Sequence, residues 1–322
     1  MTTDLLEPSR SSTDAATALY AKAIENSKRV RWDIERDVIR GRSFDHGKKW
    51  MPDGLSKLDR ITFLQPEQKR LLSQIQGRTY ANMFGMIERY IGTKTIELGR
   101  GHGLGDQVAC EALVRMADEE LKHQALFRRL ETMMAAGMPA GYMLVPQPNE
   151  VASFVLGKGN WAVLALTLDI ELFSLSHYRS SIEPDEGLSE LWKDVFRFHW
   201  IEESQHVSLD ELEWRSVHAG CSAAEREQGV TELIELVGAV DGLVLAQAEA
   251  DANYFFSIGG NALDSGQAQQ VRDTLRQAYR WQYITSGAVE PRFASTLAAL
   301  TTEAQLQRIG AALAPIVADS GA

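Results

Sequence analysis

Apolar residues recur every three to four positions along most of the chain, the spacing of a helix that buries one face. The apolar–polar alternation typical of a β-strand is nearly absent, and glycine and proline fall mainly between the periodic segments. We therefore expect an almost entirely helical protein. The predicted helices cover residues 15–38, 65–92, 105–136, 160–181, 188–218, 222–257, 265–286 and 290–317.

Two predicted helices begin with clear start signals. Pro66 stands where proline is tolerated in a first turn, and Ser222 precedes Glu225 by three residues, the pattern of a capping box. The segment 137–159 is predicted to be a link that contains glycine and proline. Since no domain boundary is visible, we expect a single all-α domain whose first twelve residues are disordered.

Polar residues interrupt the apolar stripe of one predicted helix, within the segment FHWIEESQHVSLD. At about 100° per residue, Glu203 and His206 lie within roughly 40° of His199 around the helix axis. The stripe is apolar before and after them, so the three side chains are expected to point into the core.

A second helix repeats part of this pattern. The segment ADEELKHQALF holds Glu120 and His123 at the spacing of Glu203 and His206. Each of the two helices follows another helix with a single acid on an apolar face, Glu88 in the first case and Glu171 in the second. That acid precedes the next glutamate by 32 residues in both cases.

Four carboxylates facing each other in a core are very unfavourable without a counter-charge, because desolvation and repulsion both oppose their ionisation. Two divalent cations would balance the four glutamates, and oxygen with imidazole donors suits iron or manganese. Single glutamates from two helices and Glu-x-x-His from two others are the ligands of ferritin-like dimetal bundles.

Other assignments are open for some of these acids. Glu119 and Glu202 also lie within reach of the metals, four residues before each histidine. Glu120 and Glu203 are preferred because they lie closer to the centre of the apolar stripe. Glu88 and Glu120 could instead be surface residues, but the helix around Glu171 is apolar on nearly every side.

With His199 added, the chain resembles the p-aminobenzoate N-oxygenase family of ferritin-like diiron arylamine oxygenases, over residues 66 to 215. The feature that carries this resemblance is the His-x3-Glu-x2-His motif on the last ligand helix. The resemblance implies a four-helix bundle at about 66–218 with additional helices before it and at 222–317. It also implies bridging by Glu120 and Glu203 and a third imidazole, His199, beside His206. The implied ligands are Glu88, Glu120, His123, Glu171, His199, Glu203 and His206.

The same resemblance implies an O₂-dependent monooxygenase with two iron ions, manganese being compatible with one or both positions. Its expected reaction is oxidation of an amine nitrogen to hydroxylamine, nitroso or nitro product, with an external electron donor or reductase. The alternatives are C–H hydroxylation or desaturation on the same centre, iron storage or ferroxidase activity, and a metal-free helical interaction protein.

Several nearby residues have two interpretations. His199 is a third imidazole ligand or a core histidine that hydrogen-bonds a ligand. Asp210 accepts a hydrogen bond from a ligand imidazole or is a solvated acid, and His177 is expected to be structural. The candidates for lining a substrate pocket, or for plain core, are Tyr80, Met83 and Phe84.

Composition and charge argue against some classes of binding partner. A net charge of −11 argues against nucleic acid or an anionic membrane as the main partner. Two distant cysteines and a polar start, with no signal peptide, favour a cytoplasmic protein. The longest apolar run contains Asp169 and Glu171 and is too short to span a membrane. A homodimer is compatible with the additional helices.

Overall fold

The computed structural model describes residues 10–259 and 263–321 of the chain. Helices make up the regular structure of these residues, and no strand is formed among them. The predicted all-α class is therefore confirmed. The expected disorder at the start of the chain falls mostly outside the described residues, while residues 10–12 belong to the first helix.

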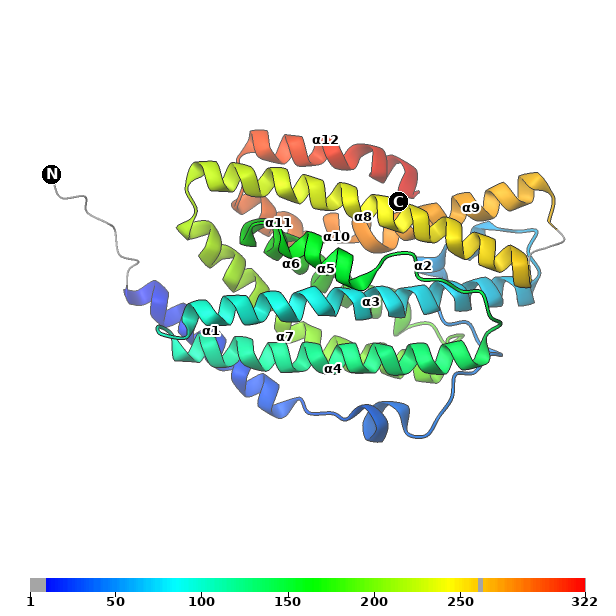
Figure 1. Cartoon of the computed structure of the whole chain (residues 1–322), viewed down its shortest axis with the longest axis horizontal. Coiled ribbons are helices and arrows are strands. Elements are labelled where there is room, and N and C mark those ends of the chain that lie inside the picture. The colour runs from blue at the N-terminus through cyan, green and yellow to red at the C-terminus, as the bar shows by residue number, and fades with distance from the viewer. Residues whose placement is uncertain (1–9, 260–262, 322) are drawn as a thin grey trace.

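A bundle of four long helices forms the core. These are α3 (Pro66–His102), α4 (Gln107–Gly137), α6 (Asn160–His177) and α7 (Glu190–Gly220). Helix α3 packs on α4, α6 packs on α7, and α4 also contacts α7. In Figure 1, α3 and α4 run side by side along the length of the molecule.

Further helices cover the bundle on opposite sides (Figure 1). Helix α1 (Arg10–Arg29) lies on α4 and α7, whereas α8 (Ala223–Ile258) covers α6. Helix α9 (Ser265–Arg280) and helix α12 (Glu303–Ser320) pack on α8. The remaining helical segments are η1 (Ile34–Ile39), α2 (Asp53–Ser56), η2 (Leu58–Arg60), α5 (Pro148–Leu156), η3 (Tyr178–Ile182), η4 (Trp281–Thr285), α10 (Ser286–Ala288) and α11 (Pro291–Ala299).

The helix boundaries differ from the predictions at several places. The capping box of Ser222 and Glu225 is formed as predicted. Helix α3, however, continues ten residues beyond the predicted end, and the predicted link 137–159 contains α5. The first predicted helix stops at Arg29, and the last is divided because Thr302 caps the start of α12.

Two glycines allow α3 to lie close to α4. A Cβ on Gly85 would lie 2.8 Å from the Cβ of Phe127, and one on Gly92 would lie 3.2 Å from the Cβ of Glu120. Larger residues at these positions would push the helices apart. The close approach brings the acids of α3 within reach of those of α4.

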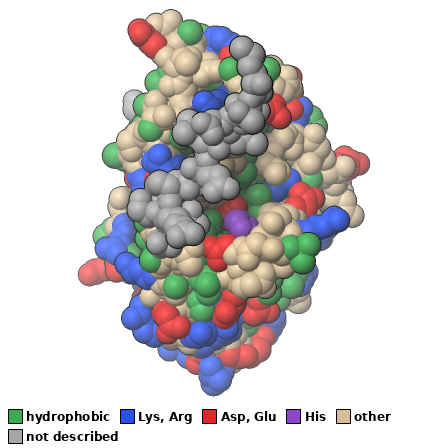
Figure 2. Space-filling model, turned by 90° about the vertical axis from the view of Figure 1, so that its left-hand side faces the viewer, with side chains coloured by type: hydrophobic (Ala, Val, Ile, Leu, Met, Phe, Trp, Pro, Cys, Tyr) green, Lys and Arg blue, Asp and Glu red, His purple; other side chains and the backbone are tan. Residues whose placement is uncertain are grey.

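Charged side chains of both signs share the end of the molecule that Figure 2 shows. Lys and Arg side chains are interspersed there with Asp and Glu. Among the helices of the described residues, none has the length and apolar character to cross a bilayer.

A buried carboxylate ties the bundle to its covering layer. Asp251 of α8 accepts hydrogen bonds from Thr79 of α3 (2.6 Å), from Tyr279 of α9 and from Gln247 (2.9 Å). Burial raises the pKa of Asp251 to about 7, although these donors oppose the shift. Helices α3, α8 and α9 are therefore connected through the carboxylate of Asp251.

Replacing this acceptor is expected to loosen the attachment of the covering layer. Asp251→Ala removes the acceptor of three buried hydrogen bonds. Tyr279 loses its acceptor, whereas Gln247 keeps its bond to Met143 O and Thr79 its contact with Tyr142, so we expect a loss of about 2–4 kcal/mol in the free energy of unfolding. Urea denaturation followed by circular dichroism measures this loss. The matched control, Glu249→Ala on the same helix, removes only exposed contacts with Arg272 and Asn253 and should cost less than about 1 kcal/mol. Equal losses in the two variants would contradict the role of Asp251.

Candidate metal centre

The seven predicted ligands come from the four bundle helices and are all buried. Helix α3 supplies Glu88 and α4 supplies Glu120 and His123, while α6 supplies Glu171. The other three, His199, Glu203 and His206, lie on α7. The helical repeat places each Glu-x-x-His pair on one inward face, as its spacing predicts.

Two overlapping groups of side chains could each hold a metal ion. The first contains Glu88, His123, His199 and Glu203, and each residue offers one donor atom within 4.8 Å of the others. His199 Nε2 lies 2.9 Å from Glu88 Oε1 and 2.8 Å from Glu203 Oε1. His123 Nδ1 lies 2.9 Å from the same oxygen of Glu203.

The second group contains Glu120, His123, Glu203 and His206, again within 4.8 Å of one another. His206 Nδ1 lies 2.7 Å from Glu203 Oε2 and 2.9 Å from Glu120 Oε1. Glu203 thus directs one oxygen to each group, which is the geometry of a carboxylate that can bridge two ions. His199 groups with His123, whereas the resemblance implies a place beside His206.

Glu171 lies next to these groups rather than within them. Burial raises the pKa of its carboxyl, as do the charge of Glu203 and a hydrogen bond shared with Glu203. On α3, burial likewise raises the pKa of Glu88, and the neighbouring Glu120 adds to the effect. In each helix pair, α3 with α4 and α6 with α7, a glutamate of the first helix therefore lies close to a glutamate of the second.

The remaining pKa shifts follow from the histidines around the shared carboxylate. Burial alone would raise the pKa of Glu203, but His199, His206 and His123 outweigh it and hold the pKa well below its usual range. Burial lowers the pKa of His199 and so favours its neutral form. A neutral imidazole has a lone pair free for a metal.

The outer nitrogens of two histidines are held by acids that the sequence pattern presents only as rival ligands. Glu202 Oε2 lies 2.9 Å from His123 Nε2, and Glu119 Oε2 lies 2.9 Å from His206 Nε2. Each hydrogen bond crosses between α4 and α7. When the proton is on Nε2, Nδ1 has the free lone pair. Both rings therefore present Nδ1 to the centre as a possible metal ligand. The sequence signal was the first acid in each Glu-Glu-x-x-His segment.

Several atoms at the centre have no hydrogen-bond partner although they are fully buried. They are Glu88 Oε2, both oxygens of Glu120, His123 Nδ1 and Glu203 Oε1. Native proteins rarely leave buried polar atoms unpaired unless an ion or another group completes the site. The donor set therefore fits metal ions, since unpaired lone pairs from α3, α4 and α7 converge on one region.

The candidate residues around the ligands are placed differently from one another. Phe84 lies edge-on to His199, with ring centroids 5.4 Å apart. Tyr80 lies within 2.8 Å of His177 Nδ1, and the other nitrogen of His177 contacts Ser286, so both belong to a separate buried network. Met83 lines a small apolar cavity instead.

Asp210 is buried, with one carboxylate oxygen unpartnered. The outer nitrogen of His206, for which Asp210 was a candidate acceptor, is already bound by Glu119. Burial raises the pKa of Asp210, while His206 opposes the shift.

Aromatic rings close the centre on the side of His123 and His199. Phe127 lies edge-on to His199 at 5.1 Å between centroids. Trp32 stacks on His123 at 6.1 Å and an interplanar angle of 12°, and Lys122 lies 4.0 Å above the indole. The same lysine pairs with Glu202. These rings keep bulk water from the ligands.

Comparison with known proteins assigns no family. No protein family model matches the chain, and no curated protein matches it in sequence. Among solved structures, an R2-like ligand-binding oxidase variant with aerobically reconstituted Mn/Fe cofactor is similar over 88% of this chain and 94% of its own, with 14% identity and a TM-score of 0.44. A variant with anaerobically reconstituted Mn/Fe cofactor gives the same coverage, 13% identity and a TM-score of 0.44. Similarity at 14% and 13% identity assigns no function to this chain.

Proposed function

We propose that the protein is an O₂-dependent dimetal oxygenase that binds two iron ions, manganese being compatible with one or both positions. The observation that carries this proposal is the shared carboxylate of Glu203, with one oxygen toward each group of donors. The unpartnered lone pairs around it would be costly in a metal-free protein. Oxygen and imidazole donors suit iron and manganese over softer metals.

The residues that would hold the metals follow from the two groups. Glu88 and His199 would serve one position and His206 the other, with Glu203 between them and Glu120 and His123 within reach of the centre. Glu171 would join through its contact with Glu203. When bound, two ferrous ions supply the electrons that activate O₂.

The chain's own part is to orient the ligands and to exclude water. Glu202 and Glu119 fix the tautomers of His123 and His206. A cavity of about 50 Å³ lies between α3, α6 and the covering helices, with Ile87 and Ile170, the chain neighbours of Glu88 and Glu171, in its wall. Its apolar walls favour a small apolar substrate.

We further propose that the oxidised group is an amine nitrogen. Support comes from His199, which lies among the donors beside Glu88 and Glu203, and from the resemblance of its helix motif to the N-oxygenase family. Repeated turnover requires an external electron donor, because each activation of O₂ consumes electrons.

Iron loading tests the centre directly. The metal-free chain is loaded with Fe(II) under nitrogen, mixed with O₂ and followed by stopped-flow absorption. We expect two irons per chain and a transient visible band whose lifetime or spectrum changes in His199→Ala, because that variant removes one imidazole from the centre.

A matched control is His218→Ala, at the far end of α7, which should leave the transient unchanged. Iron binding without any difference between His199→Ala and the unsubstituted chain would remove His199 from the ligand set. Absence of iron uptake would overturn the dimetal proposal, and uptake of hundreds of irons per assembly would favour storage.

The choice between nitrogen and carbon oxidation rests on the product. With ¹⁸O₂, a reductant and a panel of small aryl and alkyl amines, we expect label on nitrogen, in hydroxylamine or nitroso products identified by mass spectrometry. Label on carbon, or an alkene product, would instead identify a hydroxylase or a desaturase.

Glu202 and Glu119, which hold the outer nitrogens of His123 and His206, should affect metal affinity without binding the metals themselves. Glu202→Gln removes the charge that orients His123, and we expect metal affinity to fall about 10–100-fold while the stoichiometry stays at two. Competition with a chelator measures the affinity. The control is Glu211→Gln on the same helix, where the carboxylate pairs with surface arginines. An unchanged affinity in Glu202→Gln would show that the contact has no part in metal binding.

A further inference from the structure

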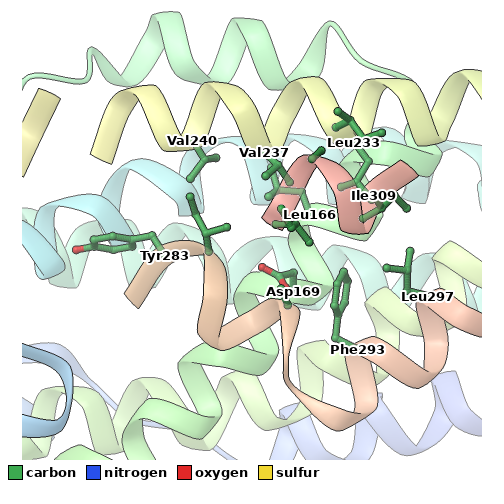
Figure 3. Close-up of a pocket in the computed structure, with 14 residues that line it drawn as sticks. Leu166, Asp169, Leu233, Val237, Val240, Tyr283, Phe293, Leu297 and Ile309 are labelled. Carbon is green, nitrogen blue, oxygen red and sulfur yellow. The ribbon is translucent and has the colours of Figure 1, made fainter. Parts of the chain in front are cut away.

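A second cavity lies between the bundle and its covering layer. It has a volume of about 60 Å³ and is formed by α6, α8, η4, α11 and α12 (Figure 3). Most of its wall is aliphatic or aromatic and includes Leu166, Leu233, Val237, Phe293 and Leu297. The cavity is separate from the metal ligands, none of which lines it.

One charged side chain enters this apolar space. Asp169 is the single charged residue among the described residues that line the cavity, and it is 9% exposed. Its Oδ1 is fully buried and has no hydrogen-bond partner. Figure 3 shows its carboxylate among the apolar side chains, while the hydroxyl of Tyr283 points away from it.

The fold makes room for this carboxylate. A Cβ on Gly287 of α10 would lie 2.5 Å from Asp169 Oδ1 and 2.6 Å from Oδ2. Any other residue at position 287 would therefore displace the acid. A glycine at this point places the carboxylate in the cavity wall instead of against a side chain.

Among the described residues, no Lys or Arg side chain lines the cavity. Burial raises the pKa of Asp169, and the charge of Glu290, which has the same sign, adds to the shift. Glu290 itself is held at the start of α11 by the backbone N–H groups of Arg292 and Phe293, and the Arg292 side chain pairs with Glu211. Two carboxylates without a paired base make this region attractive to a positive group.

Neither the metal centre nor water satisfies Asp169. Asp169 and Glu171 are about 200° apart around α6, so they face opposite sides of the helix. A buried water needs two to four polar partners, and the lining offers it mainly hydrocarbon. A buried acid that is unpaired costs free energy unless a ligand pairs with it.

We propose that this cavity binds an apolar primary amine, with its ammonium group donating to Asp169. The inference stands on Asp169 and its cavity and goes beyond the oxygenase proposal. An aliphatic tail longer than this cavity would extend toward the neighbouring cavity of about 50 Å³, because Leu166, Val240 and Tyr283 line both. That space in turn shares Val151 and Val240 with an open groove between α5 and α8, so movement of these side chains would open a route to the surface.

Calorimetric titration of the full-length chain under nitrogen at pH 7.5 tests the site. The probes are n-hexylamine, 1-hexanol and hexanoate, which share a tail and differ in the head group. We expect the amine to bind at least tenfold more tightly than the alcohol and hexanoate to show no binding. Asp169→Asn should weaken the amine at least tenfold, to the level of the alcohol.

Two further variants locate the site. Asp273→Asn, the same kind of change at an exposed acid of α9 that pairs with Arg276, should leave the amine affinity unchanged. Ala312→Leu reduces the cavity without touching the charge and should weaken amine and alcohol alike. Equal affinity for amine and alcohol, unchanged amine binding in Asp169→Asn, preference for hexanoate, or no binding of any probe would each overturn the proposal.

Discussion

The structure depends on the electrostatic cost of placing many carboxylates in the core of a helical bundle. Glu88, Glu120, Glu171 and Glu203 meet there, and Glu119, Glu202 and Asp210 lie directly around them. Burial and mutual repulsion both oppose ionisation of such a set. Only compensating positive charge makes the arrangement stable, and His123 and His206, whose pKa values the surrounding acids raise against burial, provide part of it together with Lys122. Two bound cations would provide the rest.

Helix packing and hydrogen bonds hold these acidic side chains in place. Gly85 and Gly92 bring α3 against α4, and the crossed contacts of Glu202 and Glu119 connect α4 with α7. Aromatic side chains then separate the centre from solvent. The covering layer adds a second internal space whose acid faces away from the centre. One helix, α6, therefore carries acids for two different environments, which is why its sequence combines extreme apolarity with Asp169 and Glu171.

The sequence predicted the helical class and the meeting of the four glutamates, because a repeated Glu-x-x-His on an apolar stripe places acids where a helix buries its side chains. It predicted less about the contacts between helices. The roles of Glu119 and Glu202 depend on which ring nitrogen faces outward, and that follows from how α4 and α7 lie against each other. Likewise, α3 passes the glycines at 99 and 101 because packing on α4 outweighs their poor helix propensity. The unpaired state of Asp169 depends on Gly287, which is distant in sequence.

The two halves of the centre are alike in their acids but unlike in their imidazoles. Seven residues before His206 stands His199, whereas Met116 stands seven residues before His123. Met116 is buried and contributes no nitrogen donor. The internal repeat therefore produces two inequivalent positions, and a pair of ions placed there would differ in affinity and in reduction potential. Broken symmetry of this kind allows one ion to be exchanged or oxidised while the other stays in place.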